Sequence, residues 1–156
     1  MKKTITFLLK KDSGEFFKQS ELTQSTSMPI LTNCLGFCVN FTATGSEKYG
    51  QYLVEQGFLE LLFKCLHKDM DLLRRELAIW ALRNLSRDEK CCKKICKNEN
   101  LYAILFEHLE TGVKNIVDHT LALMSNIATY VPESHDNLLP VENMPYASKG
   151  KLVTIM

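Results

Sequence analysis

Three segments of the chain are similar to one another, and each is centred on an asparagine. They read TNCLGFCVNFTA at residues 32–43, ELAIWALRNLSR at 76–87 and DHTLALMSNIAT at 118–129. Their asparagines, Asn40, Asn84 and Asn126, are separated by 44 and 42 residues. Self-similarity at such a period is typical of stacked repeat proteins, in which each unit buries its apolar face against its neighbours.

Apolar residues in the three segments occupy the same offsets from the asparagine: five and two residues before it, and one residue after it. Offsets three apart follow one stripe along a helix. A small residue also stands six positions before each asparagine, where another helix can approach closely. The pattern predicts long helices near residues 28–43, 71–87 and 113–130. The stripe residues are Leu35, Cys38, Phe41, Ile79, Leu82, Leu85, Leu121, Met124 and Ile127, and the small residues are Cys34, Ala78 and Thr120.

The connecting segments repeat as well: SEKYGQYLVEQGFLELLFKCL at 46–66 is similar to DEKCCKKICKNENLYAILFEHL at 88–109. Each opens on a capping residue followed by glutamate, Ser46 in the first segment and Asp88 in the second, which indicates a helix start. A break follows in each, at Gly57 and at residues 98–100, and then a second apolar helix. One repeat is therefore a short, a medium and a long helix, with a period near 42 residues.

The stretch YLVEQGFLELLFKCLHKDMDLLRRELAIWALRNLSRD at 52–88 resembles an armadillo repeat, especially the importin-alpha-like kind. That family carries a glycine between its first two helices, as at Gly57, and E-x-A-x-W-A-L-x-N-[IL]-[AS] on its third. The resemblance extends over roughly residues 28–130. It implies an all-α right-handed superhelix, an armadillo-type solenoid whose short array has incomplete end repeats. The third-helix matches are Glu76, Ala78, Trp80, Ala81, Leu82, Asn84, Leu85 and Ser86.

The ends of the chain fit the repeat poorly. Residues 1–27 are interpreted as an N-terminal segment that is a remnant of a preceding repeat, and residues 28–131 as the armadillo-like repeats. Residues 132–156 are expected to be an irregular C-terminal tail, which holds three of the four prolines. An array this short leaves apolar ends open, so self-association through those ends is also expected.

The resemblance implies that the third helices line a concave groove for an extended peptide. Asn40, Asn84 and Asn126 would then bind the backbone of the peptide, because a carboxamide matches the donor and acceptor of a peptide unit. Trp80, the single tryptophan, would form an aromatic wall for a long side chain of the ligand. In the alternative interpretation the asparagines bridge neighbouring helices and bind no ligand.

Charged residues border the same face. Glu76 and Asp118 stand one turn before the tryptophan position, whereas Arg83 and Arg87 lie on or beside it. A site for a basic nuclear localisation signal would need a cleaner acidic rim. We therefore expect a non-catalytic protein–protein interaction module that binds an extended peptide or a partner protein. The alternatives are an importin-alpha-like nuclear transport adaptor and a structural segment of a longer scaffold.

Charge is balanced overall, at a formal +1, but it is unevenly distributed. Residues 64–97 contain ten basic and five acidic residues, and residues 98–145 contain one basic and seven acidic. The lysines of KCCKKICK at 90–97 either form the solvated face of a short helix or contact an acidic partner. With so small a net charge, nucleic acid is not the expected partner.

Other functional classes find little support in the sequence. The apolar stretch at 4–9 is shorter than a secretory signal needs, and no run approaches a membrane span. The six cysteines and four histidines lack zinc-site spacing, so the cysteines are predicted to pack in the core of a protein from a reducing compartment. We expect no enzyme, metal, cofactor, small-molecule substrate or membrane partner, and a cytoplasmic or nuclear location.

Overall fold

The computed structural model describes residues 21–44 and 47–134, with side chains from residue 29 onward. Every regular element in these ranges is helical, which confirms the expected all-α class. The predictions for residues 1–20 and for the tail beyond residue 134 lie outside the described part. The elements are α3 (Glu21–Ala43), α4 (Glu47–Glu55), α5 (Phe58–Cys65), α6 (Leu72–Leu85), α7 (Glu89–Ile95), α8 (Leu101–Glu110), α9 (Lys114–Tyr130) and the 3-10 turn η1 (Pro132–Ser134).

The predicted long helices at 71–87 and 113–130 correspond closely to α6 and α9, but the predicted start of the first at residue 28 is wrong. Helix α3 begins at Glu21 and continues through Pro29. Proline lacks the backbone N–H that a helix interior requires, so a sequence pattern gives no reason to extend a helix across it. The end of the predicted N-terminal segment 1–27 is therefore helical from Glu21.

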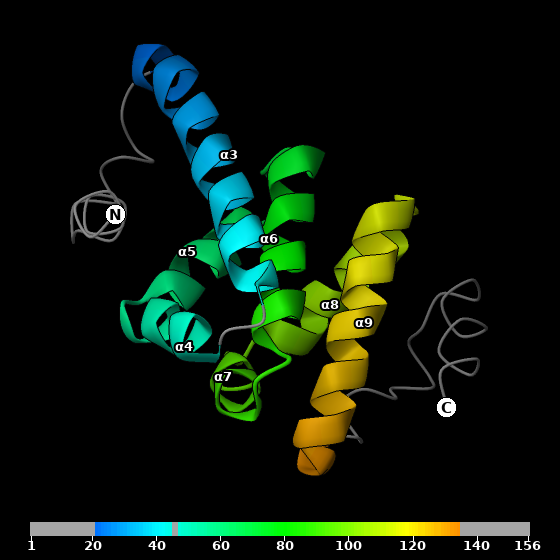
Figure 1. Cartoon of the computed structure of the whole chain (residues 1–156). Helices are drawn as coiled ribbons and strands as arrows, with labels where there is room; N and C mark the ends of the chain where they lie inside the picture. The colour runs from blue at the N-terminus through cyan, green and yellow to red at the C-terminus, as the bar shows by residue number, and fades with distance from the viewer. Residues whose placement is uncertain (1–20, 45–46, 135–156) are drawn as a thin grey trace.

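Helices α3, α6 and α9 lie side by side and run in the same direction (Figure 1). Hydrogen bonds at both ends of the α6–α9 pair fix this arrangement. Near the helix starts, Asn115 Nδ2 donates to Glu76 Oε1 at 2.9 Å. Near the helix ends, Asn126 Nδ2 donates to Ser86 Oγ at 2.8 Å. The three segments that are similar in sequence thus form one repeat-like layer of parallel helices.

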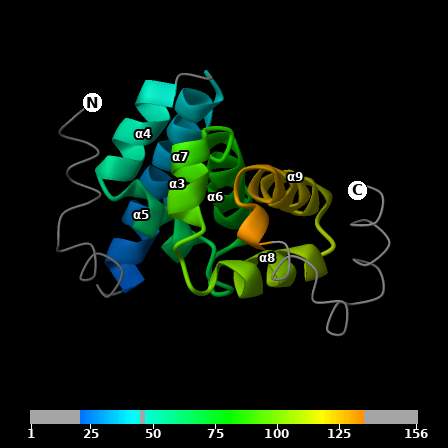
Figure 2. The same ribbon diagram turned by 90° about the horizontal axis from the view of Figure 1, so that it is seen from below.

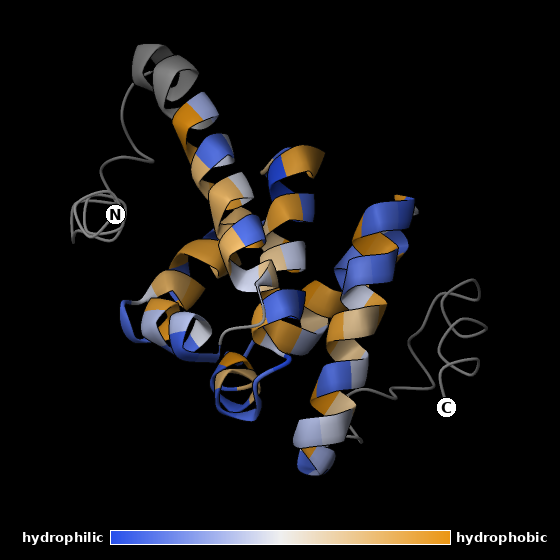
Figure 3. Ribbon diagram, in the orientation of Figure 1, coloured by the Kyte–Doolittle hydropathy of each residue, from blue (hydrophilic) through white to orange (hydrophobic). Residues whose placement is uncertain are grey.

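The shorter helices pack around this layer: α5 contacts α6, α8 contacts α9, and α4 contacts α7 (Figure 2). Hydrophobic residues gather where the helices face one another, whereas the turns beside α7 are hydrophilic (Figure 3). The predicted apolar stripe is confirmed, because all of its members except the half-buried Phe41 and Leu121 are buried. The prediction that the cysteines pack in the core is confirmed for four of them, Cys38, Cys65, Cys91 and Cys92, whereas Cys34 and Cys96 are half-buried. All six are free thiols.

The predicted break at Gly57 and the predicted cap at Asp88 are present, whereas the predicted cap at Ser46 lies outside the described residues. Gly57 has a φ of 80°, a left-handed conformation that glycine adopts without strain, and α5 begins at the next residue. Asp88 caps α7 by accepting a hydrogen bond from the Cys91 N–H at 2.9 Å. Burial raises the pKa of Asp88, but the hydrogen bonds from Cys91 and Gln51 outweigh burial, so the pKa lies below its usual value.

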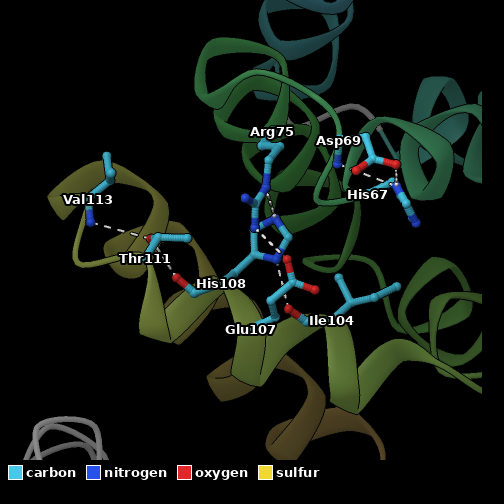
Figure 4. A network of polar contacts seen from close by, with 8 residues as sticks. All are labelled: His67, Asp69, Arg75, Ile104, Glu107, His108, Thr111 and Val113. Carbon is cyan, nitrogen blue, oxygen red and sulfur yellow. Dashed lines mark hydrogen bonds and ion pairs between the residues drawn. The ribbon is translucent and has the colours of Figure 1, made fainter.

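A buried polar network, which the sequence analysis did not anticipate, joins α6 to α8 (Figure 4). Arg75 is 7% exposed, and its Nη2 pairs with Glu107 Oε1 at 3.1 Å. Arg75 Nε donates to His108 Nε2 at 3.4 Å, and His108 Nδ1 lies 2.7 Å from the Ile104 carbonyl oxygen. Neutral His108 satisfies both contacts, with Nδ1–H as donor and Nε2 as acceptor.

Acidification below about pH 6.5 is expected to destabilise the fold through His108. Burial, and then Arg75, lower the pKa of His108 in the folded chain. The unfolded chain therefore binds the proton first, so the contribution of neutral His108 is complete above the ordinary pKa and is lost as pH falls. Urea unfolding at pH 7.5 and 5.5 measures the loss.

The variant His108→Gln should reduce the difference between the two pH values, because glutamine does not titrate. His67→Gln is the matched control, since the His67 side chain is 62% exposed. If both variants keep the pH dependence of the wild type, His108 is not the group responsible.

Candidate peptide-binding face of the long helices

The central asparagine, Asn84, connects α6 to α3. Its Nδ2 donates to the Val39 carbonyl oxygen and to Thr42 Oγ1, both at 3.3 Å. Thr42 Oγ1 in turn donates to the Cys38 carbonyl at 2.8 Å. These bonds link the last turns of two parallel long helices.

The next asparagine repeats this arrangement one unit later. Asn126 Nδ2 donates to the Arg83 carbonyl oxygen at 3.4 Å and to Ser86 Oγ at 2.8 Å. In both units the carbonyl acceptor belongs to the residue just before the asparagine of the preceding repeat. The hydroxyl acceptor belongs to the residue two positions after that same asparagine. The repeat read from the sequence is therefore also a repeat of hydrogen bonds, and Asn84 and Asn126 bridge helices as the alternative interpretation expects.

The three asparagines differ in exposure. Asn84 is only 6% exposed, Asn126 is half-buried and Asn40, on α3, is exposed. The helix-bridging bonds of Asn84 and Asn126 use the amide nitrogen. Contact of these asparagines with a peptide stays a prediction. In Asn84 and Asn126 the amide nitrogen already bonds a neighbouring helix, so the carboxamide oxygen is the atom that would bind the peptide.

Trp80 forms an aromatic pair with a residue of the next long helix. Its indole stacks on the imidazole of His119 in α9, with ring centroids 4.9 Å apart and planes 21° from parallel. Trp80 is half-buried and also packs against the core. The aromatic wall expected from the sequence is thus an indole–imidazole pair, in which His119 covers one face of the indole.

Polar groups surround this pair. Arg83 Nη1 lies 3.5 Å from His119 Nδ1, and Glu76 accepts the hydrogen bond from Asn115 described above. Burial, and then Arg83, lower the pKa of His119, although Glu76 and Asp118 oppose them. His119 is therefore a neutral ring at pH 7, suited to stacking and to hydrogen bonding with Arg83. We call Glu76, Trp80, Arg83, Asn115 and His119 the α6–α9 surface.

The remaining predicted residues lie beside this surface. Asp118 is exposed and pairs with Lys114 Nζ at 2.9 Å, one turn earlier on α9. Arg87 is exposed in the turn after α6. The two carboxylates that were expected to border the groove therefore have partners within the chain: Lys114 for Asp118, and Asn115 for Glu76.

Asn115 and His119 were not predicted from the sequence, because the repeat alignment places other residues opposite Glu76 and Trp80. In the repeat spacing, Trp80 corresponds to Ala122 and Glu76 to Asp118. The observed partners lie three residues earlier on α9, which is close to one helical turn. Parallel helices displaced by one turn therefore account for both contacts.

Comparison with known proteins adds no relative: no protein-family model, curated protein or solved structure matches the chain. Within residues 21–44 and 47–134, no helix is both long and apolar enough to cross a membrane. The same part of the chain contains no group of three or more histidine, cysteine, aspartate or glutamate side chains placed to hold a metal ion.

Proposed function

We propose that the chain is a non-catalytic protein-interaction module of the armadillo type, which binds an extended peptide along α3, α6 and α9. The α6–α9 surface carries this proposal. It combines a stacked aromatic pair with a carboxylate and a guanidinium on parallel helices held in register. Aromatic residues and arginine are the residue types most often found at the energetic centres of protein interfaces.

The chemistry of this surface suits a peptide of mixed character. The indole of Trp80 offers apolar area to an aliphatic or cationic side chain. Arg83 provides donors for carbonyl or carboxylate groups, and Glu76 provides an acceptor one turn before Trp80. A strongly basic nuclear localisation signal fits less well, because the cationic Arg83 lies on the same surface beside His119. This argues against the importin-alpha-like adaptor and for a general binding module.

A structural segment of a longer armadillo scaffold is the second candidate, and the asparagine bonds favour it. Asn84 and Asn126 both use their amide nitrogens to hold neighbouring helices together. A library of extended peptides titrated against the full chain distinguishes the candidates. Binding of mixed sequences supports the module, binding restricted to basic peptides supports the adaptor, and an absence of binding supports the structural segment.

Trp80→Ala is expected to weaken binding of a peptide from that library by more than about 1 kcal/mol, or roughly fivefold in Kd. The substitution removes the indole and leaves His119 without its stacking partner. Calorimetric titration measures the affinity, and urea unfolding of the same samples measures stability.

Phe63→Ala is the matched control, because Phe63 is an aromatic residue of α5 that, like Trp80, is half-buried and packs against the core, and it belongs to none of the long helices. It should leave the affinity unchanged. If Trp80→Ala unfolds the chain as a core substitution does, Trp80 serves the packing of α6 and α9, and the binding proposal loses its principal residue.

A further inference from the structure

The end of α7, the start of α8 and the turn after α9 come together in one region of the fold (Figure 2). A pocket of about 440 Å³ lies among them. Lys93, Cys96 and Lys97 line it from α7 and its end, Tyr102 lines it from α8, and Glu133 lines it from η1. The volume is in the range of small-molecule sites, which is about 300–1,000 Å³. None of these residues belongs to the α6–α9 surface.

Cys96 differs from the other cysteines in its acidity. Burial raises the pKa of Cys38, Cys65 and Cys91 to about 12. Cys34 is half-buried, as Cys96 is, yet burial also raises its pKa. The pKa of Cys96 is instead lowered, so more of this thiol is present as the thiolate, the form that acts as a nucleophile.

The reason for this difference is Cys92, one turn earlier on α7. A hydrogen bond between the two side chains lowers the pKa of Cys96 and outweighs both burial and the carboxylate of Glu133, which raise it. The same hydrogen bond, followed by burial, raises the pKa of Cys92 far above its usual value. Cys92 is fully buried and keeps its proton, so it acts as the donor to a partly exposed Cys96 sulfur.

We propose that Cys96 is a site of reversible thiol–disulfide exchange with a small disulfide that carries carboxylates, such as glutathione disulfide. The Cys96 thiolate attacks one sulfur of the disulfide, a new S–S bond forms, and the original S–S bond breaks. The other half of the small disulfide leaves as a thiolate. The Cys96 sulfur is oxidised and the leaving half is reduced, and attack by a second small thiol reverses the step.

Two lysines explain the preference for an anionic reagent. Lys93 and Lys97 are exposed at the pocket and attract carboxylates to the side of Cys96. Lys93 also pairs with Glu89 at 2.6 Å, but both side chains are more than half exposed and such pairs exchange readily with solvent ions. Glu133 acts in the opposite sense, because its carboxylate repels the anionic reagent and disfavours the thiolate.

The first test compares Cys96 with Cys34 in the full chain. Glutathione disulfide is added at several pH values from 6 to 9, and peptide mass mapping follows the modification of each cysteine. We expect Cys96 to react at least about tenfold faster than Cys34, since the thiolate fraction controls the rate at these pH values. Equal rates for the two half-buried thiols would show that exposure alone governs reactivity and would overturn the proposal.

The second test uses surface lysines, whose substitution leaves the core intact. Lys97→Gln should slow the reaction of Cys96 with glutathione disulfide about threefold or more, through the loss of one nearby charge. The reaction with the neutral 2-hydroxyethyl disulfide should not change. Lys94→Gln is the matched control on α7, because Lys94 is exposed but does not line the pocket. Equal slowing by both lysine variants, or none by Lys97→Gln, would contradict a pocket selective for anions.

The remaining variants test the electrostatic balance at the sulfur. Glu133→Gln should accelerate the reaction, and Cys92→Ala should move the pH–rate profile of Cys96 to higher pH. Circular dichroism confirms that each variant is folded, and Glu133→Gln decides the outcome if Cys92→Ala is unstable. A Cys96 profile that neither folded variant changes would remove the basis of the proposal.

Discussion

Leu82→Ala is expected to lower the free energy of unfolding by about 2–5 kcal/mol. Leu82 is 0% exposed in the central helix, which is packed between α3 and α9. Removal of its branched end takes apolar surface out of contact and leaves a cavity that close-packed neighbours fill only in part. Urea unfolding gives the difference in the free energy of unfolding between the variant and the wild type. Circular dichroism at about 222 nm, which reports helix content, follows the transition.

Leu73→Ala is the control, because it makes the same chemical change in the same helix at a residue that is 55% exposed. The expected loss is below about 1 kcal/mol, since little surface is buried there. Comparable losses for the two variants would mean that α6 is not the centre of the packed layer.

Asn84→Ala is expected to lower the free energy of unfolding by about 1–3 kcal/mol, because buried acceptors on α3 lose their donor. The acceptors are the Val39 carbonyl and Thr42 Oγ1. Alanine has the higher helix propensity, which offsets part of the loss. Asn40→Ala is the matched comparison at the equivalent repeat position, where the side chain is exposed, and it should be nearly neutral.

A double-mutant cycle with Thr42→Val tests whether the loss arises from the bond itself. We expect the two substitutions to be non-additive by at least about 0.5 kcal/mol, as contacting polar pairs are. Additive effects would place the contribution of Asn84 elsewhere. Peptide titration of Asn84→Ala completes the comparison, since a loss of affinity without a loss of stability would restore Asn84 to a ligand-binding role.

The sequence alone predicted those parts of the fold that depend on one helix and its turns. The apolar stripe through Ile79 and Leu82 identified the buried face of α6. Gly57 marked the break between α4 and α5, and Asp88 marked the start of α7. These signals are local, because a helix face, a left-handed turn and a cap each involve residues within a few positions of one another.

The contacts between helices could not be read in the same way. The stacking of His119 on Trp80 depends on how far α9 is displaced along α6, and no pattern within one helix contains that displacement. The burial of Asn84 likewise depends on the presence of Val39 and Thr42 beside it. The sequence therefore identified the asparagine as unusual, but the neighbouring helix determines which of its atoms remain available.

Adjacent residues with the same chemistry can also have opposite surroundings. Arg74 and Arg75 are neighbours, yet Arg74 is half-buried and pairs with Asp71, the residue that caps their own helix, whereas Arg75 is buried against α8. Successive residues are about 100° apart around a helix axis, so the two side chains leave α6 in different directions. Only the position of His108 and Glu107 on α8 shows which arginine has a buried role.

The repeated asparagine bond gives the stack of long helices a polarity. Each donor reaches back to the helix of the preceding repeat, so within the described part of the chain Asn40 holds the donor position at the edge that α3 forms. At the edge formed by α9, the equivalent acceptor positions are the Ser125 carbonyl and residue 128, where Ala128 has no hydroxyl to offer. The two edges are unlike, so chains that joined through them would meet head to tail and not across a two-fold axis. An association of that kind does not end at a dimer but lengthens as the concentration rises, unless the accumulated rotation closes it into a ring.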